Sequence, residues 1–584
     1  MTEVRPKPLY FGPSERPLFG WLHAPASAPR DTGVVVCNPF GYEAACTHRS
    51  LRHFARAAAG AGLPAMRFDY DGTGDSAGDD LDAGRVEAWV RSVHHAIDEL
   101  RARAGVTTVH LVGIRFGATL AALAASTRSD VASLAAIMPV VRGKAWLREL
   151  NALEIAMRFA EPPPEFATTD ATAESVGFAI TEETRNALSG IDLTSAVGTK
   201  PAPAVLLVDR GDNPLIDRWA EALSARDVSV TRLPATEYAE MMLDPHDAAV
   251  PATMVSQVTD WLASRSAPGL SGAARLPADD RKTSAAMAPG FEERAVFLEP
   301  THTLFGVMTV PANGVTGRAI VLLNSGANPH VGPSRQYVRL ARRWASLGHL
   351  VLRFDIAGIG DSSPWPGHEE NVVYSSTAVQ DVGAAVRYLR EEWRVESAHA
   401  VGLCSGAYHG FKAAVAGFPL ASVAVVNPLV FFWKAGMSLA YPLYQVSQAA
   451  AEYKRSLFRL EKWGKLLRGQ VDVSEAAHLV ARRIAFRAKT VMKSAARAAG
   501  RPMAEDLGGE LELVAARAVG LRFVFSVGDP GEDLLRLEGG GMVRRLLRQR
   551  KLTIQRIAGP NHAFTPRWSH HALRQVLERE LGLS

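Results

Sequence analysis

Two short glycine turns in this chain of 584 residues have the spacing that presents a reactive side chain. In each, an apolar run ends at a Gly-x-Nu-x-Gly turn and an alanine-rich segment follows: HLVGIRFGATLAALAA around Arg115 and HAVGLCSGAYHGFKAA around Cys404. Small residues two positions away let the backbone turn sharply and lift the central side chain above a sheet. Cys404 is therefore a candidate nucleophile. The alternative is a small buried hydrophobic residue, which is the commoner role of an isolated cysteine.

This strand, turn and helix resemble the nucleophile elbow of the α/β-hydrolase superfamily, and the resemblance covers essentially both halves of the chain. Members carry a nucleophile, an acid and a histidine in that order. Downstream of Cys404, RFVFSV ends at Gly528-Asp529-Pro530, and TIQRIAGPNHAFTP places His562 on a loop after the last strand. The resemblance implies that Asp529 orients His562 and that His562 moves the thiol proton. Asp533 is the second candidate for the acid.

The same resemblance implies an oxyanion hole, built from backbone N–H groups. One donor would be Ser405, directly after the nucleophile. The other would come from the loop after Asn324, as Ser325 or Gly326. The helix that begins after the turn and a neighbouring imidazolium would both favour a thiolate at Cys404.

The first half lacks the reactive residues. Arg115 stands in the nucleophile position, and a guanidinium that stays protonated cannot attack a carbonyl. Tyr238 aligns with His562, whereas Asp212 aligns with the acid. We expect a domain without hydrolase chemistry, in which Arg115 forms a structural ion pair, with Asp212 as a candidate partner. A site for a substrate carboxylate or phosphate is the alternative.

The two halves are copies of one another. Leu18-Phe19-Gly20 recurs as Leu304-Phe305-Gly306, Asn38 as Asn324, and RFDYDGTGDS as RFDIAGIGDS, each 286 residues later. The last two segments resemble those of the paired hydrolases associated with exosortase systems. Short apolar strands alternate with helical segments, which predicts two tandem α/β-hydrolase domains with mainly parallel sheets. We place them at residues 1–265 and 290–584, joined by a linker at 266–289 and packed as a pseudo-dimer.

An insertion in the second half predicts a helical lid at about residues 428–509. Aromatic residues in its first part, Trp433 among them, would wall an apolar pocket above Cys404. Between residues 454 and 501, thirteen Lys or Arg residues, including Arg482, Arg483 and Arg487, face only three acidic ones. This charge favours an anionic partner, either coenzyme A, an acidic acyl carrier protein or an anionic membrane surface. A solvated helix face is the plainer alternative.

Composition excludes several other classes. With 47% hydrophobic and 21% charged residues, the chain can bury full cores, and a net charge of +5 is too small to indicate nucleic acid. Three cysteines cannot form a disulfide framework, and the first residues contain no apolar leader. We expect a cytoplasmic protein without a membrane-spanning segment, a metal or a cofactor.

A cysteine nucleophile favours an activated acyl donor, because attack of a thiol on a thioester exchanges one thioester for another at little net cost. A water-excluding lid would then direct the acyl group to an acceptor. The leading hypothesis is an acyltransferase or cyclase that forms an acyl-Cys404 intermediate from a coenzyme A or carrier-protein thioester. The alternatives are a thioesterase or esterase, and a non-catalytic scaffold or binding protein.

Overall fold

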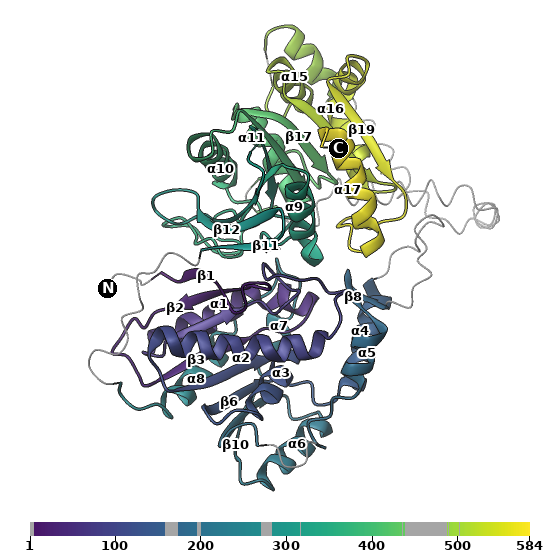
Figure 1. The fold of residues 1–584 in the computed structure, drawn as a ribbon. Helices are drawn as coiled ribbons and strands as arrows, with labels where there is room; N and C mark the ends of the chain where they lie inside the picture. Colours follow the sequence, from purple (N-terminus) through teal and green to yellow (C-terminus); the bar gives the residue numbers. More distant parts are fainter. Residues whose placement is uncertain are drawn as a thin grey trace, which may run out of the picture.

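The computed structural model describes residues 5–157, 173–195, 200–269, 283–315, 317–434, 436–437, 488, 490–501 and 503–583. It contains two large sheets, one in each half of the chain, with helices on their faces (Figure 1). The predicted fold class, two mainly parallel α/β domains, is confirmed.

The first domain has an eight-stranded sheet of order β1-β2-β4-β3-β5-β6-β9-β10. Its strands are β1 (Lys7–Phe11), β2 (Leu18–His23), β3 (Thr32–Cys37), β4 (Ala65–Phe68), β5 (Thr108–Ile114), β6 (Val131–Ile137), β9 (Ala204–Asp209) and β10 (Ser229–Pro234). Its helices are α1 (Tyr42–Gly60), α2 (Arg85–Ala104), α3 (Phe116–Ala125), α4 (Gly143–Met157), α5 (Glu182–Ser189), α6 (Pro214–Ser224), α7 (Tyr238–Met241) and α8 (Ala252–Ala263). A small hairpin, β7 (Ala173–Ser175) and β8 (Phe178–Ile180), stands apart from the sheet.

The second domain repeats this order with one added edge strand, as β11-β12-β13-β15-β14-β16-β17-β18-β19. The strands are β11 (Ser284–Ala288), β12 (Phe291–Phe297), β13 (Phe305–Pro311), β14 (Arg318–Leu323), β15 (Leu350–Phe354), β16 (Ser397–Leu403), β17 (Leu420–Val426), β18 (Gly520–Ser526) and β19 (Leu552–Ile557). The helices are η3 (Pro333–Arg335), α9 (Gln336–Ser346), α10 (Ala378–Glu392), α11 (Ser405–Ala416), α15 (Leu507–Ala516), α16 (Pro530–Arg548) and α17 (Arg567–Leu581).

The linker prediction is wrong at its C-terminal end. Residues 284–288 form β11, which pairs antiparallel with β12 and continues the second sheet. The sequence Ser-Ala-Ala-Met-Ala has no alternation of apolar and polar residues, so nothing in it marked a strand. Figure 1 shows β11 at the domain boundary, beside β1 of the other domain.

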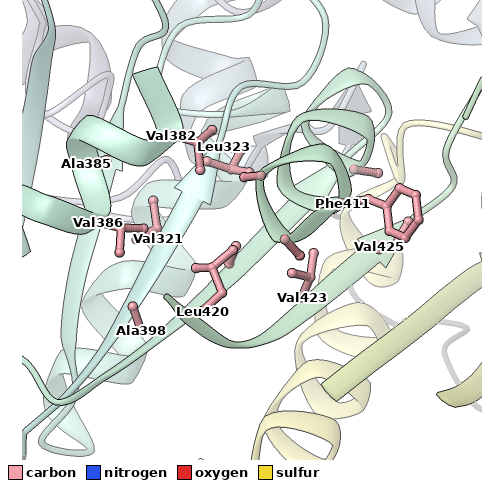
Figure 2. Close-up of a cluster of buried hydrophobic side chains, with 14 of the residues drawn as sticks. Val321, Leu323, Val382, Ala385, Val386, Ala398, Phe411, Leu420, Val423 and Val425 are labelled. Carbon is pink, nitrogen blue, oxygen red and sulfur yellow. The ribbon is translucent and has the colours of Figure 1, made fainter. Parts of the chain in front are cut away.

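Parallel strands buried on both faces explain the apolar runs of the sequence. In the second domain, Val321 and Leu323 of β14 point into a cluster with Val382 and Val386 of α10 (Figure 2). The same cluster holds Phe411 of α11, which is fully buried. The helix carrying the glycine turn is therefore fixed against the centre of the sheet.

Reciprocal contacts join the two domains. Arg67 of the first pairs with Asp361 of the second at 2.5 Å, and Arg353 of the second pairs with Asp75 of the first at 2.5 Å. In residue number, Arg353 and Asp361 lie 286 after Arg67 and Asp75. The rings of Phe19 and Phe305, which are also 286 apart, stack with centroids 6.2 Å from each other. Pairs that exchange partners in this way are the pattern of an isologous interface.

The repeated Gly-x-Gly-Asp-Ser segments build this interface. In the first copy Asp69 accepts a hydrogen bond from the N–H of Asp75, and Ser76 donates to the carbonyl of Asp69. A Cβ on Gly74 would lie 2.0 Å from the Asp69 carboxylate, so only glycine allows the turn. The turn presents Asp75 to the other domain, which gives the motif a structural role that the sequence did not reveal.

The predicted lid lies mostly outside the described residues. Arg482, Arg483, Arg487 and the part of the basic run before residue 488 are outside them. Among the residues that are described, no helix is long and apolar enough to span a membrane.

Candidate active site

The turn around Cys404 has the strained geometry expected of a nucleophile elbow. Cys404 has φ 58° and ψ −116° between β16 and α11, a region that non-glycine residues rarely occupy. A Cβ on Gly402 would lie 2.1 Å from the backbone of Gly406, and a Cβ on Gly406 would lie 2.6 Å from the carbonyl oxygen of Asn324. Both glycines are required, and Cys404 is left partly exposed above the sheet.

His562 and Asp529 meet beside Cys404. Asp529 caps α16 by accepting a hydrogen bond from the N–H of Gly531 at 2.8 Å, and its other oxygen lies 2.7 Å from Nδ1 of His562. The acid in contact with the ring is therefore Asp529, the first of the two candidates. The side chain of Asn427, directly after β17, donates to the His562 carbonyl oxygen at 2.7 Å and holds the loop.

The charges around His562 favour the protonated form of its imidazole ring. Burial lowers the pKa of His562, but the Asp529 carboxylate and the neighbouring Cys404 outweigh it and raise the pKa to about 10. The Cys404 side chain is in hydrogen-bond contact with the ring. The structure thus brings together the three residues that the sequence singled out, with the imidazole between the thiol and the carboxylate.

The candidate oxyanion donors are resolved in part. Ser405 is the first residue of α11, where helix N–H groups have no partner within the helix. The N–H of Gly326 donates to the Ser405 hydroxyl at 2.9 Å. The N–H of Gly326 therefore already has an acceptor. Of the two loop candidates, Ser325 stays the predicted donor to the oxyanion.

An aromatic wall flanks Cys404. The ring of Trp433 stacks on Tyr374 with centroids 4.2 Å apart and an interplanar angle of 15°, and Tyr408 contacts Tyr374 edge-on at 5.3 Å. Burial and the charge of nearby Cys404 raise the pKa of Tyr374. The sequence pointed to Trp433 but not to Tyr374, which lies in a loop without any motif.

The first domain has the same turn as the second, with Arg115 at the position of Cys404. Arg115 has φ 53° and ψ −122°, matching Cys404. Its guanidinium pairs with Glu43 at 2.8 Å and with Glu149. Burial lowers the pKa of Arg115, but Glu43, Tyr238 and Glu149 raise it above its usual value. The predicted structural ion pair is present, and Asp212 is not its partner: that side chain is exposed and lies 3.5 Å from Arg210.

The structural counterpart of Asp529 is Asn213, not Asp212. Asn213 caps α6 before Pro214, as Asp529 caps α16 before Pro530, and each accepts a hydrogen bond from the N–H two residues on. Arg115, Tyr238 and Asn213 therefore occupy the positions of Cys404, His562 and Asp529. A one-residue difference in the loop concealed this in the sequence.

A cavity of about 970 Å³ lies between the domains and reaches the histidine and the acid. Its walls include Trp21, Asn38, Ala44, Ala45, Asp69, Asp75 and Asp244 of the first domain, and His330, Arg335, Asp361, Asp529 and His562 of the second. His562 and Asp529 line the cavity, whereas Cys404 is not among its lining residues. The sequence did not predict this space, because it depends on how the two domains pack.

One group on the cavity wall has the composition of a metal site. His330, Asp355 and Asp361 place one ligand atom each within 4.8 Å of one another. However, Nδ1 of His330 lies 2.7 Å from Asp355 and Nε2 lies 2.6 Å from Asp75. Burial lowers the pKa of His330, but these two carboxylates hold it well above its usual range. A ring that donates from both nitrogens has no lone pair for a metal.

Comparisons with known proteins found matches among solved structures. No family model and no curated protein matches the chain. Among solved structures, similar ones include the α/β serine hydrolase XC6422 of Xanthomonas campestris, at 16% identity and TM-score 0.29, covering 45% of this chain and 94% of that one. The Pyrococcus furiosus esterase Pf2001 has 14% identity, TM-score 0.32 and coverage of 45% and 92%. Est1E of Butyrivibrio proteoclasticus has 14% identity, TM-score 0.32 and coverage of 44% and 98%.

Proposed function

We propose that this protein is an acyl-transfer enzyme that forms an acyl-Cys404 intermediate from a thioester donor. The observation that carries the proposal is the position of the His562 ring, 2.7 Å from the Asp529 carboxylate and in contact with the Cys404 thiol on a strained elbow. This arrangement is that of an activated nucleophile with its base and the group that orients the base.

In the proposed donor step, Cys404 is the nucleophile and His562 supplies the proton. The thiolate of Cys404 attacks the carbonyl carbon of the thioester, so that a new C–S bond forms while the donor C–S bond breaks. His562, protonated at rest, gives its proton to the leaving thiol. The N–H groups of Ser405 and Ser325 are the proposed donors to the oxyanion. The wall of Tyr374, Tyr408 and Trp433 beside Cys404 would hold an apolar part of the acyl donor.

The donor proposed is coenzyme A or an acyl carrier protein, held by the basic run that includes Arg482, Arg483 and Arg487. Those residues lie outside the described part of the chain, so this binding role stays a prediction from charge. The first domain is proposed to act as the second half of a pseudo-dimer, which the reciprocal pairs Arg67–Asp361 and Arg353–Asp75 support.

Intact-protein mass spectrometry tests the intermediate. Wild type is incubated with acyl-coenzyme A thioesters of several chain lengths and compared with Cys404→Ala and His562→Ala. We expect a mass increment of one acyl group in wild type, none in Cys404→Ala, and formation slowed about a hundredfold or more in His562→Ala. An increment that survives Cys404→Ala would refute the assignment of the nucleophile.

Hydrolysis is the second candidate function, because the same acyl-enzyme can react with water. Product analysis in the presence of amines and alcohols separates the two. An acyl adduct of the acceptor indicates transfer, whereas free acid alone indicates a thioesterase. A thiol that forms no adduct and consumes no thioester would favour the non-catalytic scaffold.

A further inference from the structure

The two domains differ at an equivalent pair of carboxylates, Asp69, which lines the cavity, and Asp355, which does not. In the second domain Asp355 is fully engaged: it accepts from Asn324 Nδ2 at 2.7 Å, from the N–H of Asp361 at 2.9 Å, and from His330 at 2.7 Å. The equivalent carboxylate of the first domain is Asp69, 286 residues earlier. Within the described residues it accepts one side-chain hydrogen bond, from the N–H of Asp75 at 3.0 Å.

The hydrogen-bond donors that would match those of Asp355 are missing around Asp69 or donate to other groups. Asn38, the equivalent of Asn324, donates to the carbonyl oxygen of Phe68 at 2.8 Å instead. The residue 286 before His330 is Ala44, whose side chain cannot donate a hydrogen bond. Asp69, Asn38 and Ala44 all line the interdomain cavity. The first domain therefore lacks the donors that surround the equivalent carboxylate of the second domain, and Asp69 faces the cavity instead.

The open groups on that wall accept hydrogen bonds. Oδ1 of Asn38 is buried and has no partner in the part of the chain that the structure describes. Burial and the neighbouring Asp75 raise the pKa of Asp69 to about 6, as expected for a carboxyl without a directly bound cation. At the exposed end of the cavity the carboxylate of Asp244 accepts from the Tyr42 hydroxyl and keeps further acceptor capacity.

Both arginines that line the described part of the cavity already have partners. Arg67 pairs with Asp361, and Arg335 donates to four backbone carbonyls of the first domain, those of Gly72, Gly74, Ser76 and Gly78. An anionic ligand would place negative charge beside Asp69 and Asp75 and would leave Oδ1 of Asn38 without a donor. A ligand that donates hydrogen bonds would satisfy both Asp69 and Asn38.

We propose that the interdomain cavity binds the acyl acceptor of the reaction, and that the first domain selects an amine or alcohol over an anion. The inference rests on the proposed function and names its second substrate. His562 is one of the residues that line the cavity. There the acceptor N–H or O–H gives its proton to neutral His562 as its nitrogen or oxygen bonds to the acyl carbon. The bond from that carbon to the Cys404 sulfur breaks, which regenerates thiolate and imidazolium.

Binding can be tested without catalysis, in the Cys404→Ala protein, by saturation-transfer NMR with ethanolamine, glycerol, acetate and methyl phosphate. Ala45 lies on α1 and lines the cavity, so Ala45→Phe would fill it. Ala102→Phe, on an exposed turn of α2 in the same domain, is the matched control. We expect ethanolamine and glycerol to bind, their affinity to fall at least tenfold with Ala45→Phe, and the control to leave it unchanged.

A second variant covers the case in which Ala45→Phe does not fold. Asp244→Asn keeps the shape of an exposed side chain and removes its charge, so it is expected to weaken ethanolamine severalfold and leave glycerol within twofold. Anions that bind as well as ethanolamine, or an absence of binding by ethanolamine and glycerol, would overturn the inference.

The two proposals fail separately. With acyl-enzyme formed from an acyl-coenzyme A thioester, Ala45→Phe is expected to leave the rate of acylation within twofold and to slow transfer to ethanolamine at least tenfold. Transfer that is unaffected overturns the acceptor site while the acyl-enzyme stands. Ligand binding that requires the open cavity, without any acyl-enzyme in wild type, overturns the proposed function instead.

Discussion

Replacing Asp529 with asparagine is expected to lower the pKa of His562 by about two pH units. The rise of this pKa from 6.5 to about 10 corresponds to roughly 5 kcal/mol in favour of the protonated ring, at about 1.36 kcal/mol for each tenfold change in proton affinity. Asp529 and Cys404 both contribute to the rise. Asparagine preserves the shape of the side chain and removes its charge, so about half of the effect should disappear and the midpoint should move to roughly 8.

The assay is an NMR titration of the protein with ¹³C-labelled histidine, in which the His562 signal is identified by its loss in His562→Gln. Asp533→Asn is the control, because the structure puts Asp529, not Asp533, at 2.7 Å from the ring. A midpoint that stays near pH 10 in Asp529→Asn, or one that moves in Asp533→Asn, would refute the reasoning.

The raised pKa of His562 also makes the free energy of unfolding depend on pH. The pKa of the folded state lies above the unfolded value of about 6.5, so the stabilisation is complete below that pH and is lost as pH rises through about 10. The difference in unfolding free energy between wild type and Asp529→Asn should be largest near pH 6 and should shrink towards pH 10. Urea denaturation at three pH values measures it.

Three further predictions concern the framework. Arg353→Met removes one cation from the buried carboxylates of Asp75 and Glu293, which keep His330 and Arg342 as partners, and should cost about 1.5–3 kcal/mol in chemical denaturation. Arg536→Met at an exposed pair should change stability by less than about 1 kcal/mol. Gly406→Ala forces a Cβ to 2.6 Å from a carbonyl oxygen and should lower stability by about 1–3 kcal/mol, while Gly541→Ala, with no atom closer than 3.9 Å, should be neutral. Arg115→Met should destabilise the first domain, measured by thermal unfolding, and leave acylation of Cys404 unchanged; lost acylation would contradict a purely structural Arg115.

The parts of the fold that follow from local pattern could be predicted from the sequence. Apolar strands alternating with helical segments indicated two mainly parallel sheets, which the structure contains. That the halves are copies of one another stays a prediction from the repeat at 286 residues. Strand β11 escaped because Ser-Ala-Ala-Met-Ala carries no periodic signal, and its pairing with β12 depends on an edge supplied by the tertiary structure. The lid prediction on residues 438–487 falls outside the described part of the chain.

Some residues of the candidate site could be predicted from the sequence and others could not. Cys404, Asp529 and His562 could be found because a turn, an ordered sequence of elements and a loop each mark one of them. The partners of Arg115 could not, since Glu43 lies 72 residues before it and Glu149 lies 34 after it. The sequence alignment chose Asp212, one residue before the true counterpart Asn213. The alignment of two short segments does not show that the loops differ in length by one residue, whereas the helix cap in the structure does.

The retained elbow of the first domain shows why glycine spacing alone is a weak sign of activity. A Cβ on Gly117 would lie 2.3 Å from the carbonyl oxygens of Cys37 and Asn38, and one on Gly113 would lie 2.4 Å from the backbone of Ala118. These glycines are required by the approach of α3 to β3 and β5, whatever residue stands between them. The strained backbone of Arg115 is therefore a product of packing. In such a turn, the evidence for catalysis lies in the central residue and its contacts: Cys404 meets an imidazole held by a carboxylate, whereas Arg115 is neutralised by two.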